Sequence, residues 1–405
     1  MIFTTSAFIL ITALLRNIEF LLPGMKTSRP KIYSFFTSKL TISVFFIIVV
    51  VLNILVAVSI RYSIKAQKSS EGENEFLKRK INFDQPFYVK GIYLSSWTAS
   101  EPVLLNRLID LAKKNKLNAV IIDLKDSHGI VAYESSVETV KNLKTSEPRI
   151  KNLKSILENL HKENLYAIAR LSVFQDPTLA SSNPSVALKN KNTGKIWADN
   201  KGLFWVDPAS LEVWDYNIAL AKEAWLMGFD EINFDYIRFP SDGNISNISY
   251  PIWDGLAPKE EIIRRFAEYQ NIVLSPLNIT RSADLFGLTF WRDDDLNIGQ
   301  NLSLLIPYFN YICPMVYPSH FPPGFENFTN PAEHPYEIVF RSLAKAKEKF
   351  IGQNALPRPW LQAFDLGAEY DSAKLAKQIK AVEDGNGYGW LLWNAQNKYN
   401  DILPY

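Results

Sequence analysis

Residues 228–243 read GFDEINFDYIRFPSDG, and this stretch decides the fold. Its short apolar run is interrupted by Asn233, Asp235 and Arg238. A charged side chain inside a buried strand costs free energy unless a partner compensates for it. The stretch therefore predicts a buried β-strand that delivers polar side chains to a site at its end. Glu231 opens the strand, at the opposite end, and is expected to be structural.

Similar apolar runs recur along the chain and alternate with amphipathic stretches of helical periodicity. The eight expected strands are 90–96, 118–126, 166–174, 231–239, 285–291, 311–317, 360–367 and 387–394. The expected helices are 102–116, 150–164, 211–227, 258–274, 336–350 and 371–382, with a reduced helix at 297–308. Eight strand–helix alternations predict an α/β fold of the (β/α)8 (TIM) barrel type. An open doubly wound sheet is the alternative, but no glycine-rich phosphate turn follows the first strand.

Composition and charge limit the class of protein. Of 405 residues, 47% are apolar and 21% are charged, which is typical of a globular chain. The single cysteine, Cys313, excludes an intrachain disulfide, and four scattered histidines argue against a multi-histidine metal site. Residues 1–82 hold 11 Lys/Arg against 4 Asp/Glu, and the rest hold 33 against 38. The mildly acidic large part argues against nucleic acid as a partner. No metal and no cofactor are expected.

The N-terminal arm contains a long apolar run. Residues 40–60, LTISVFFIIVVVLNILVAVSI, carry no charge and as a helix would span roughly 30 Å, the thickness of a bilayer core. We therefore expect a single transmembrane helix that acts as an uncleaved signal anchor, after a cytoplasmic segment at 1–39. A polar linker at 61–83 would lead to the barrel at 84–405, on the extracytoplasmic side of the membrane.

Two other interpretations of this run compete with the anchor. Small residues at 56–59, VAVS, are compatible with a cleavage site, which would make the segment a removable signal peptide. A buried core helix is the second alternative, but the run has no polar face. The first 15 residues are also apolar and could form a weaker second hydrophobic segment.

In a barrel of this type, side chains at the carboxyl ends of the strands converge on one cavity. The residues expected there are carboxylates, arginines and aromatics. Two long connections, 175–210 and 240–257, also follow strands and would shape the substrate site. The proposed substrate-binding residues are Trp97, Asp126, Arg170, Arg238, Trp291, Tyr317, Gln362 and Trp393, with Tyr317 and Trp393 as flat platforms for a sugar.

This set of side chains favours glycoside chemistry. A sugar acetal needs one ionised carboxylate near its anomeric carbon and one protonated carboxyl near its leaving oxygen. Neither a GxSxG elbow nor an HExxH motif is present. Asp235 is the proposed nucleophile, kept ionised by Arg238 or Arg170. The structural alternative is that Asp235 forms a buried ion pair that only braces the barrel.

Several motifs together resemble a family of glycoside hydrolases that was long catalogued as a domain of unknown function and is distantly similar to α-amylase-type barrels. The motifs are KGIYLSSW, VIIDLKDSHG, ARLSVFQDP, GFDEINFDYIRFPSDG, YICPMVYPSH and GWLLWNA, and they extend over roughly 88–400. The resemblance implies a barrel glycosidase, usually tethered or secreted, that acts on a carbohydrate polymer. In amylase-like barrels the nucleophile is an Asp at the end of strand four, which falls on Asp235.

The resemblance leaves the general acid open. Amylase-type barrels carry a Glu on strand five, whereas the expected fifth strand here ends TFWRD at 289–293. Candidates for the acid are Asp293, Asp123, Asp126 and Asp365. The missing Glu motivates a second hypothesis, a non-catalytic glycan-binding or wall-organising barrel. A polysaccharide deacetylase is a third, but it would need a metal site.

Overall fold

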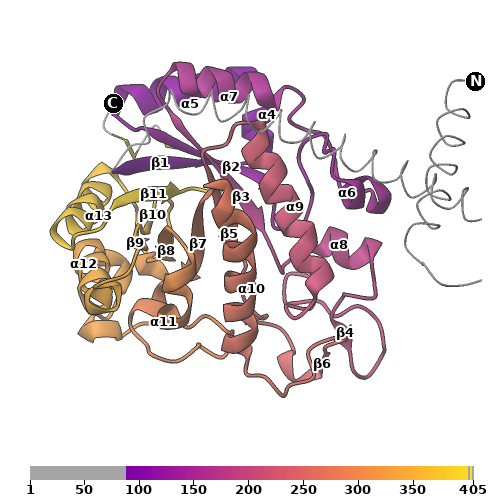
Figure 1. The fold of residues 1–405 in the computed structure, drawn as a ribbon. Helices are drawn as coiled ribbons and strands as arrows, with labels where there is room; N and C mark the ends of the chain where they lie inside the picture. Colours follow the sequence, from indigo (N-terminus) through magenta and orange to yellow (C-terminus); the bar gives the residue numbers. More distant parts are fainter. Residues whose placement is uncertain (1–87, 400–401, 404–405) are drawn as a thin grey trace, which may run out of the picture. The chain divides into compact units, whose positions relative to one another are not determined.

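The computed structural model describes residues 88–399 and 402–403 (Figure 1). The expected segments 1–39, 40–60 and 61–83 lie outside these residues. Within the described part, no helix is both long enough and apolar enough to cross a membrane.

Eight parallel strands close into a barrel (Figure 1). Closure is made by the pairing of Trp360 with Met315, which joins the seventh barrel strand to the sixth. The predicted (β/α)8 barrel is confirmed. The barrel strands are β1 (Val89–Leu94), β2 (Ala119–Lys125), β3 (Tyr166–Ser172), β5 (Glu231–Asp235), β7 (Thr280–Phe286), β8 (Tyr311–Met315), β10 (Trp360–Gln362) and β11 (Gly389–Trp393), and β9 (Leu356–Pro357) lies beside β8.

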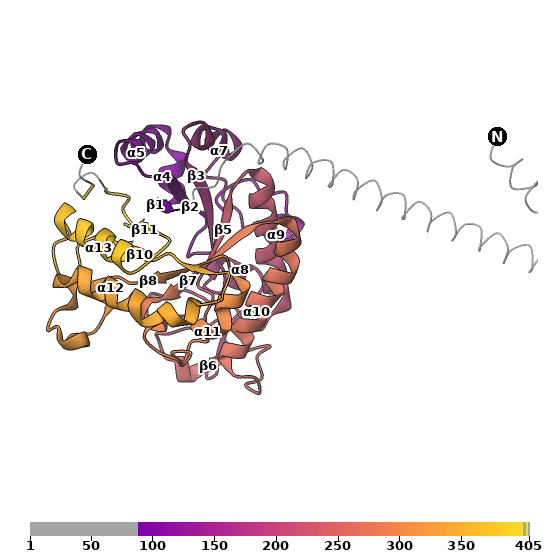
Figure 2. The ribbon, with the colours of Figure 1, turned by 60° about the vertical axis from the view of Figure 1, so that its left-hand side comes forward.

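Helices surround the barrel in chain order (Figure 2). Their starts follow ordinary capping rules: Pro102, Pro177 and Pro335 occupy first-turn positions, and the Ser210 hydroxyl accepts a hydrogen bond from the Val213 N–H at 3.3 Å. The helices are α4 (Ser96–Ser100), α5 (Pro102–Lys114), α6 (Glu138–Leu143), α7 (Leu153–Lys162), α8 (Pro177–Ser182), α9 (Leu211–Met227), α10 (Lys259–Leu274), α11 (Leu302–Leu305), α12 (Pro335–Ala346) and α13 (Ser372–Asp384).

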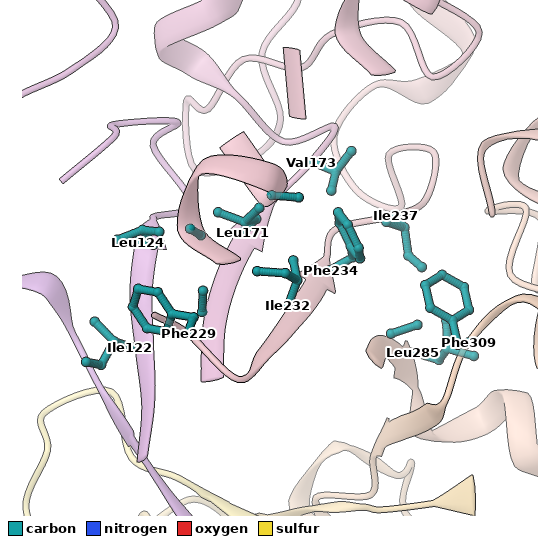
Figure 3. Close-up of a cluster of buried hydrophobic side chains, with 14 of the residues drawn as sticks. Ile122, Leu124, Leu171, Val173, Phe229, Ile232, Phe234, Ile237, Leu285 and Phe309 are labelled. Carbon is teal, nitrogen blue, oxygen red and sulfur yellow. The ribbon is translucent and has the colours of Figure 1, made fainter. Parts of the chain in front are cut away.

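The core has two layers because side chains alternate across each strand. Outward-facing side chains form the larger hydrophobic cluster between the strands and the helices; Ile122, Leu171, Phe234 and Leu285 belong to it (Figure 3). A smaller cluster, which includes Ile121, fills the inside of the barrel. The inner face of every strand is therefore available either for packing or, at its end, for a site.

The fifth barrel strand differs from its expected position. The apolar run 285–291 predicts a strand there, but β7 occupies Thr280–Phe286, and a 3-10 turn, Gly287–Phe290, follows it. The turn begins at Gly287, where the backbone approaches β8 closely: a Cβ at this position would lie 2.6 Å from the Met315 carbonyl oxygen. The prediction for this strand was wrong by about five residues, and it misplaced the residues expected at the strand's end.

The two long connections pair with each other. Residues 189–190 of the first form β4 (Lys189–Asn190), which runs antiparallel to β6 (Ile248–Ser249) of the second. The buried Trp197 side chain strengthens this link by donating from its indole N–H to the Asn244 carbonyl oxygen at 3.1 Å. The connections therefore act as one structured wall beside the carboxyl ends of β3 and β5 rather than as two separate loops.

Candidate active site

Strand register brings five polar side chains together inside the barrel. Asp123 on β2 pairs in register with Arg170 on β3, and Arg170 with Asn233 on β5. Asn233 lies opposite a serine of β7, so Asp235 and Asp284, each two residues further on, project from neighbouring strands to the same side. The cluster sits near the carboxyl ends of strands two to five.

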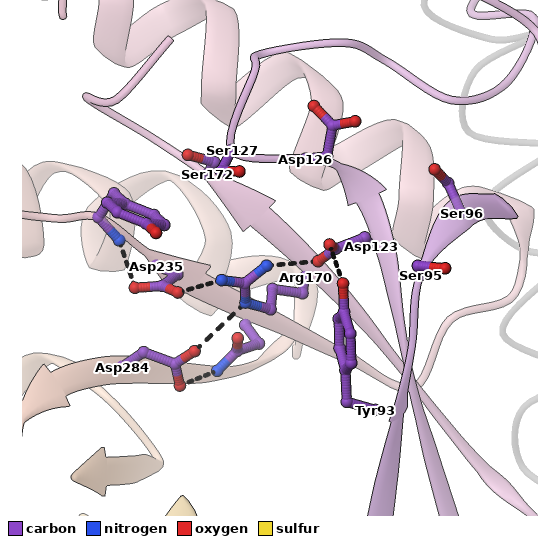
Figure 4. A network of polar contacts seen from close by, with 12 residues as sticks. Tyr93, Ser95, Ser96, Asp123, Asp126, Ser127, Arg170, Ser172, Asp235 and Asp284 are labelled. Carbon is purple, nitrogen blue, oxygen red and sulfur yellow. Dashed lines mark hydrogen bonds and ion pairs between the residues drawn. The ribbon is translucent and has the colours of Figure 1, made fainter. Parts of the chain in front are cut away.

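Arg170 is the centre of this cluster (Figure 4). Its Nη1 donates to Asp123 and its Nη2 to Asp235, and its Nε lies 3.6 Å from the Asp284 Oδ2. The guanidinium is almost fully buried. One arginine thus contacts three carboxyl groups in a site of low dielectric, where charge interactions are strong.

Asp235 ends β5 and lies on the cavity wall. Its Oδ2 accepts from Arg170, and its Oδ1 accepts from the Tyr236 backbone N–H at 2.5 Å. Both carboxylate oxygens of Asp235 therefore accept a hydrogen bond from the protein. Tyr236 has a φ of +52°, a left-handed conformation that costs a non-glycine residue free energy. This turn directs the chain away from the strand immediately after the carboxylate.

The Asp284 carboxyl group on β7 has a raised pKa. Burial, together with the negative charge of Asp235, raises its pKa to about 8, while Arg170 opposes the shift. Its Oδ1 accepts from the Asn233 side-chain amide at 2.8 Å and from the Trp360 indole at 2.7 Å. At neutral pH Asp284 is therefore mostly protonated. Two neighbouring carboxyl groups, one ionised and one protonated, are the arrangement that acid-assisted displacement needs.

A cavity of about 480 Å³ opens over these two carboxyl groups. Its size is typical of a small-ligand site. The residues that line it are Arg170, Lys201, Asp235, Tyr236, Arg238, Asp284, Phe286, Gly287, Leu288, Met315, Tyr317, His320, Phe321, Trp360 and Trp393.

Five of the residues predicted for the site line this cavity. Asp235, Arg170, Arg238, Tyr317 and Trp393 reach it from different strands or the segments that follow them. The Trp393 ring packs 5.1 Å from the Arg170 guanidinium carbon and so presents one aromatic face near the carboxylates. Of the two arginines expected near Asp235, Arg170 forms the ion pair and Arg238 does not.

Asp123 lies beside the site but is not among the residues that line the cavity. One of its carboxylate oxygens accepts from Arg170 and the other from the Tyr93 hydroxyl at 2.5 Å. Both oxygens are occupied, so the structure favours a positioning role for Asp123 over that of the acid.

Asp126 and Trp97 lie on the outer rim. Asp126 pairs with Arg149 at 2.9 Å, and its other oxygen accepts from the His128 and Ile130 backbone N–H groups. The Trp97 side chain is 62% exposed, and Arg149 stacks on its ring. Neither residue lines the cavity.

Three further predicted residues are placed elsewhere. The Asp293 side chain is 94% exposed and pairs with Lys349 at 2.7 Å, outside the cavity. The Trp291 indole donates to the Ser342 hydroxyl at 2.8 Å and packs against α12. Gln362 is fully buried and bonds backbone groups. Trp291 and Asp293 came from an apolar run that continues past the true end of β7, whereas Gln362 ends β10. None of the three lines the cavity.

Sequence reasoning missed Asp284. It occupies strand five, where an acid was sought, but the strand was placed too late in the chain. The signal was present: Asp284 interrupts the apolar run ADLFG at 283–287 in the same way that Asp235 interrupts its own strand. Within the described part of the chain, no group of three or more His, Cys, Asp or Glu side chains is arranged to hold a metal ion.

Comparison with known protein families gives one match. The model of a family described as "putative glycosyl hydrolase domain" matches residues 91–399, which is most of the chain. The chain belongs to this family. Membership assigns it to the glycoside hydrolases, as the motifs indicated. A search of curated proteins finds no match.

Two solved structures share the fold of this domain at low sequence identity. The glycoside hydrolase domain of PgaB (BpsB) from Bordetella bronchiseptica aligns with a TM-score of 0.56 at 13% identity, covering 76% of this chain and 94% of that one. An endo-1,4-beta-mannanase from Rhizomucor miehei aligns with a TM-score of 0.50 at 12% identity, covering 79% and 90%. A hypothetical protein from Ruminiclostridium thermocellum is 36% identical over 51% of this chain and 98% of its own, with a TM-score of 0.44.

Proposed function

We propose that this glycoside hydrolase is a retaining enzyme in which Asp235 is the nucleophile and Asp284 is the general acid and base. The observation that carries the proposal is the contrast between the two carboxyl groups. The Asp235 carboxylate is ion-paired with Arg170, while burial and the charge of Asp235 raise the pKa of Asp284 to about 8, so that Asp284 keeps its proton at neutral pH.

The reaction then has two steps. An Asp235 oxygen attacks the anomeric carbon, the bond to the leaving oxygen breaks, and Asp284 gives that oxygen its proton. In the second step Asp284, now a carboxylate, takes a proton from water. The water oxygen attacks the anomeric carbon, and the ester bond to Asp235 breaks. Both carboxyl groups return to their starting states.

The geometry of Arg170 supports retention over inversion. Retaining enzymes separate their carboxyl groups by about 5–5.5 Å, and inverting enzymes by about 6.5–9.5 Å to leave room for water. Asp235 and Asp284 contact adjacent nitrogen atoms of one guanidinium, Nη2 and Nε. A shared guanidinium favours the shorter separation.

The position of Asp284 also removes the main reason for the hypothesis of a non-catalytic barrel. That hypothesis rested on the absence of an acid on strand five, and Asp284 occupies strand five beside the nucleophile. A glycan-binding protein without activity is therefore the less supported alternative.

Replacing Asp235 with Asn tests the proposal. We expect at least a 1,000-fold loss of reducing-end release, because an amide cannot form the glycosyl ester. Asp293→Asn is the matched control, since it makes the same chemical change at an exposed site. Both variants should show the circular dichroism of the wild type. Turnover by Asp235→Asn at the rate of the Asp293→Asn control would refute the assignment.

We propose in addition that the run 40–60 anchors the enzyme in a membrane, so that its substrate is an extracellular or cell-envelope polysaccharide. The support is the length and lack of charge of this run. The full chain should sediment with membranes and resist extraction by alkaline carbonate, while a chain that begins at residue 84 should not. Release of the full chain by carbonate would contradict the anchor.

A further inference from the structure

Arg238 is a buried cation without a carboxylate partner. It is only 6% exposed, and it lines the cavity. Its Nη1 donates to the Phe239 carbonyl oxygen at 3.0 Å and to the Ser241 hydroxyl at 3.1 Å. Among the residues that the structure describes, no carboxylate forms an ion pair with Arg238, and its Nε and Nη2 donate to no protein atom. A buried arginine is ordinarily paired, so this one has donors left for a ligand.

Aromatic rings hold the Arg238 guanidinium in place. Its central carbon lies 4.7 Å from the Phe286 ring, 4.8 Å from the Trp205 ring and 5.5 Å from the Tyr236 ring. Aromatic faces stabilise a cation without using its N–H donors. The planar fork is therefore fixed before a ligand arrives, which lowers the entropy cost of binding.

Arg170, the second arginine that lines the cavity, differs from Arg238 because its donors are already bound to carboxylates. Its Nη1 and Nη2 donate to Asp123 and Asp235. It holds catalytic and positioning carboxylates and has little capacity left for an external anion. The two arginines therefore line different parts of the cavity: a carboxylate-rich floor around Arg170, and a wall at Arg238, which is attracted by Asp235, Asp242 and Asp199 but forms an ion pair with none of them.

Lys201 and His320 complete this wall. Lys201, on the connection between β3 and α9, is exposed and lines the same cavity as His320, which follows β8. Burial and the charge of Lys201 lower the pKa of His320, so the imidazole is a neutral hydrogen-bonding group. The wall thus offers two positive charges and one neutral polar group.

Two nearby carboxylates, Asp199 and Asp242, attract Arg238 electrostatically but form no ion pair with it. Asp199 accepts from the Lys201 and Leu203 backbone N–H groups at 2.9 Å each and from the Trp205 indole at 3.1 Å. Asp242 accepts from the Asn200 backbone N–H at 3.1 Å. Both organise the connection, and neither forms an ion pair with Arg238 or Lys201 among the described residues.

We propose that Arg238 and Lys201 form an anion-binding subsite, so that the substrate is an acidic glycan. The charged group is a carboxylate or a sulfate or phosphate ester on a sugar unit, and the Arg238 fork would bind two of its oxygens. This rests on the proposed function, since the subsite opens into the cavity of the two catalytic carboxyl groups. A neutral glycan would leave Arg238 buried and unpaired, which costs binding free energy.

Matched pairs of glycans test the subsite. The probes are oligogalacturonate and its methyl ester, a sulfated galactan oligosaccharide and its desulfated form, and a phosphorylated mannan and its dephosphorylated form. Calorimetric dissociation constants are measured on the full chain, and reducing-end release is followed in parallel. The variants are Arg238→Gln and Lys201→Gln. Lys195→Gln is the control, because it removes the same charge from the same connection outside the cavity.

We expect at least one acidic member to bind roughly 10-fold or more tightly than its neutral partner, as one or two charge-assisted hydrogen bonds allow. Arg238→Gln should abolish that preference, Lys201→Gln should reduce it several-fold, and Lys195→Gln should leave it intact. Which pair responds identifies the charged group. If Arg238→Gln fails to fold, the test depends on the Lys201→Gln variant, which changes an exposed side chain and should still reduce the preference for the acidic probe.

The proposal is overturned if no acidic probe binds, if both members of every pair bind equally, or if the preference survives in Arg238→Gln and Lys201→Gln. Hydrolysis of a neutral glycan without an acidic preference removes the subsite and leaves the proposed function standing. An acidic preference without reducing-end release keeps the subsite and removes the proposed hydrolysis.

Discussion

Arg170 is the residue on which the geometry of the site depends. It binds Asp235 directly, lies 3.6 Å from Asp284, and is itself held by Asp123. Burial and the negative charge of Asp235 raise the pKa of Asp284, while Arg170 opposes that shift. The sequence predicted Asp235 and Arg170 from charges in apolar strands, and the same signal at Asp284 was lost only through the misplaced strand.

The role of Asp284 predicts a dependence on the leaving group. Asp284→Ala should slow the hydrolysis of ordinary glycans about 100-fold or more, because the leaving oxygen receives no proton. Aryl glycosides with a dinitrophenyl leaving group need no acid, so they should lose much less in their first step. Burst kinetics measure both steps. An equal loss on both substrate classes would contradict the assignment.

The raised pKa of Asp284 also predicts an alkaline limit. The first step needs the protonated form, which is lost as pH rises through about 8. The kcat/KM of the wild type should therefore be level below this pH and fall about 10-fold per pH unit above it, because kcat/KM reports the free enzyme. With aryl glycosides, the kcat/KM of Asp284→Ala should not show this fall at alkaline pH. If the kcat/KM of the wild type already began to fall near pH 5 as the pH rises, this would argue against Asp284 as the acid.

At the scale of elements, the sequence indicated helices well and strand ends less well. Helix α9 has the predicted bounds, 211–227, because capping residues flank its periodic pattern. Strand β7 was misplaced because its first residues, Thr280 and Arg281, are polar, while the apolar run continues into the 3-10 turn that follows. Apolar composition reports burial, and a buried turn looks like a strand by that criterion. The β4–β6 pairing depends on contacts between distant segments, which single-sequence periodicity does not contain.

The link between the two long connections predicts a separable effect on substrate binding. Trp197→Ala removes a buried indole and its hydrogen bond to Asn244, so the wall beside the cavity should loosen. We expect KM to rise several-fold with kcat nearly unchanged, and limited proteolysis within 189–200 to become faster. Leu256→Ala, in the second connection but 87% exposed, is the control and should alter neither. An unchanged KM and unchanged proteolysis would contradict a role for this link.

At the scale of the whole molecule, the two ends of the barrel differ in function: one end carries the candidate site and the other stabilises the fold. The carboxyl ends of the strands carry the site, while the opposite end holds a fully buried ion pair between Glu231 and Arg358. Glu231 was expected to be structural because it opens its strand, and its partner lies 127 positions away in the sequence. The barrel class was predictable from eight alternations, but this pairing across the barrel was not.

Breaking the ion pair between Glu231 and Arg358 should lower the stability of the fold and leave the catalytic rate nearly unchanged. Glu231→Gln leaves the Arg358 charge buried without a counter-charge, which should lower the free energy of unfolding by roughly 3–5 kcal/mol. The kcat of the folded enzyme should stay within about 2-fold of the wild type. Replacing Arg358 with Met as well should recover part of the loss in denaturant titrations. A double variant less stable than Glu231→Gln, or a large loss of kcat, would contradict this division.

The most direct test of the account is mass spectrometry of a trapped glycosyl–enzyme. A panel of fluorinated glycosides with good leaving groups slows both steps, so a covalent intermediate accumulates. After protease digestion, we predict one labelled peptide, with the sugar esterified to Asp235, and no label in the Asp235→Asn variant. A sugar attached to another carboxylate would contradict the account, as would turnover of these glycosides with inversion at the anomeric carbon and no adduct.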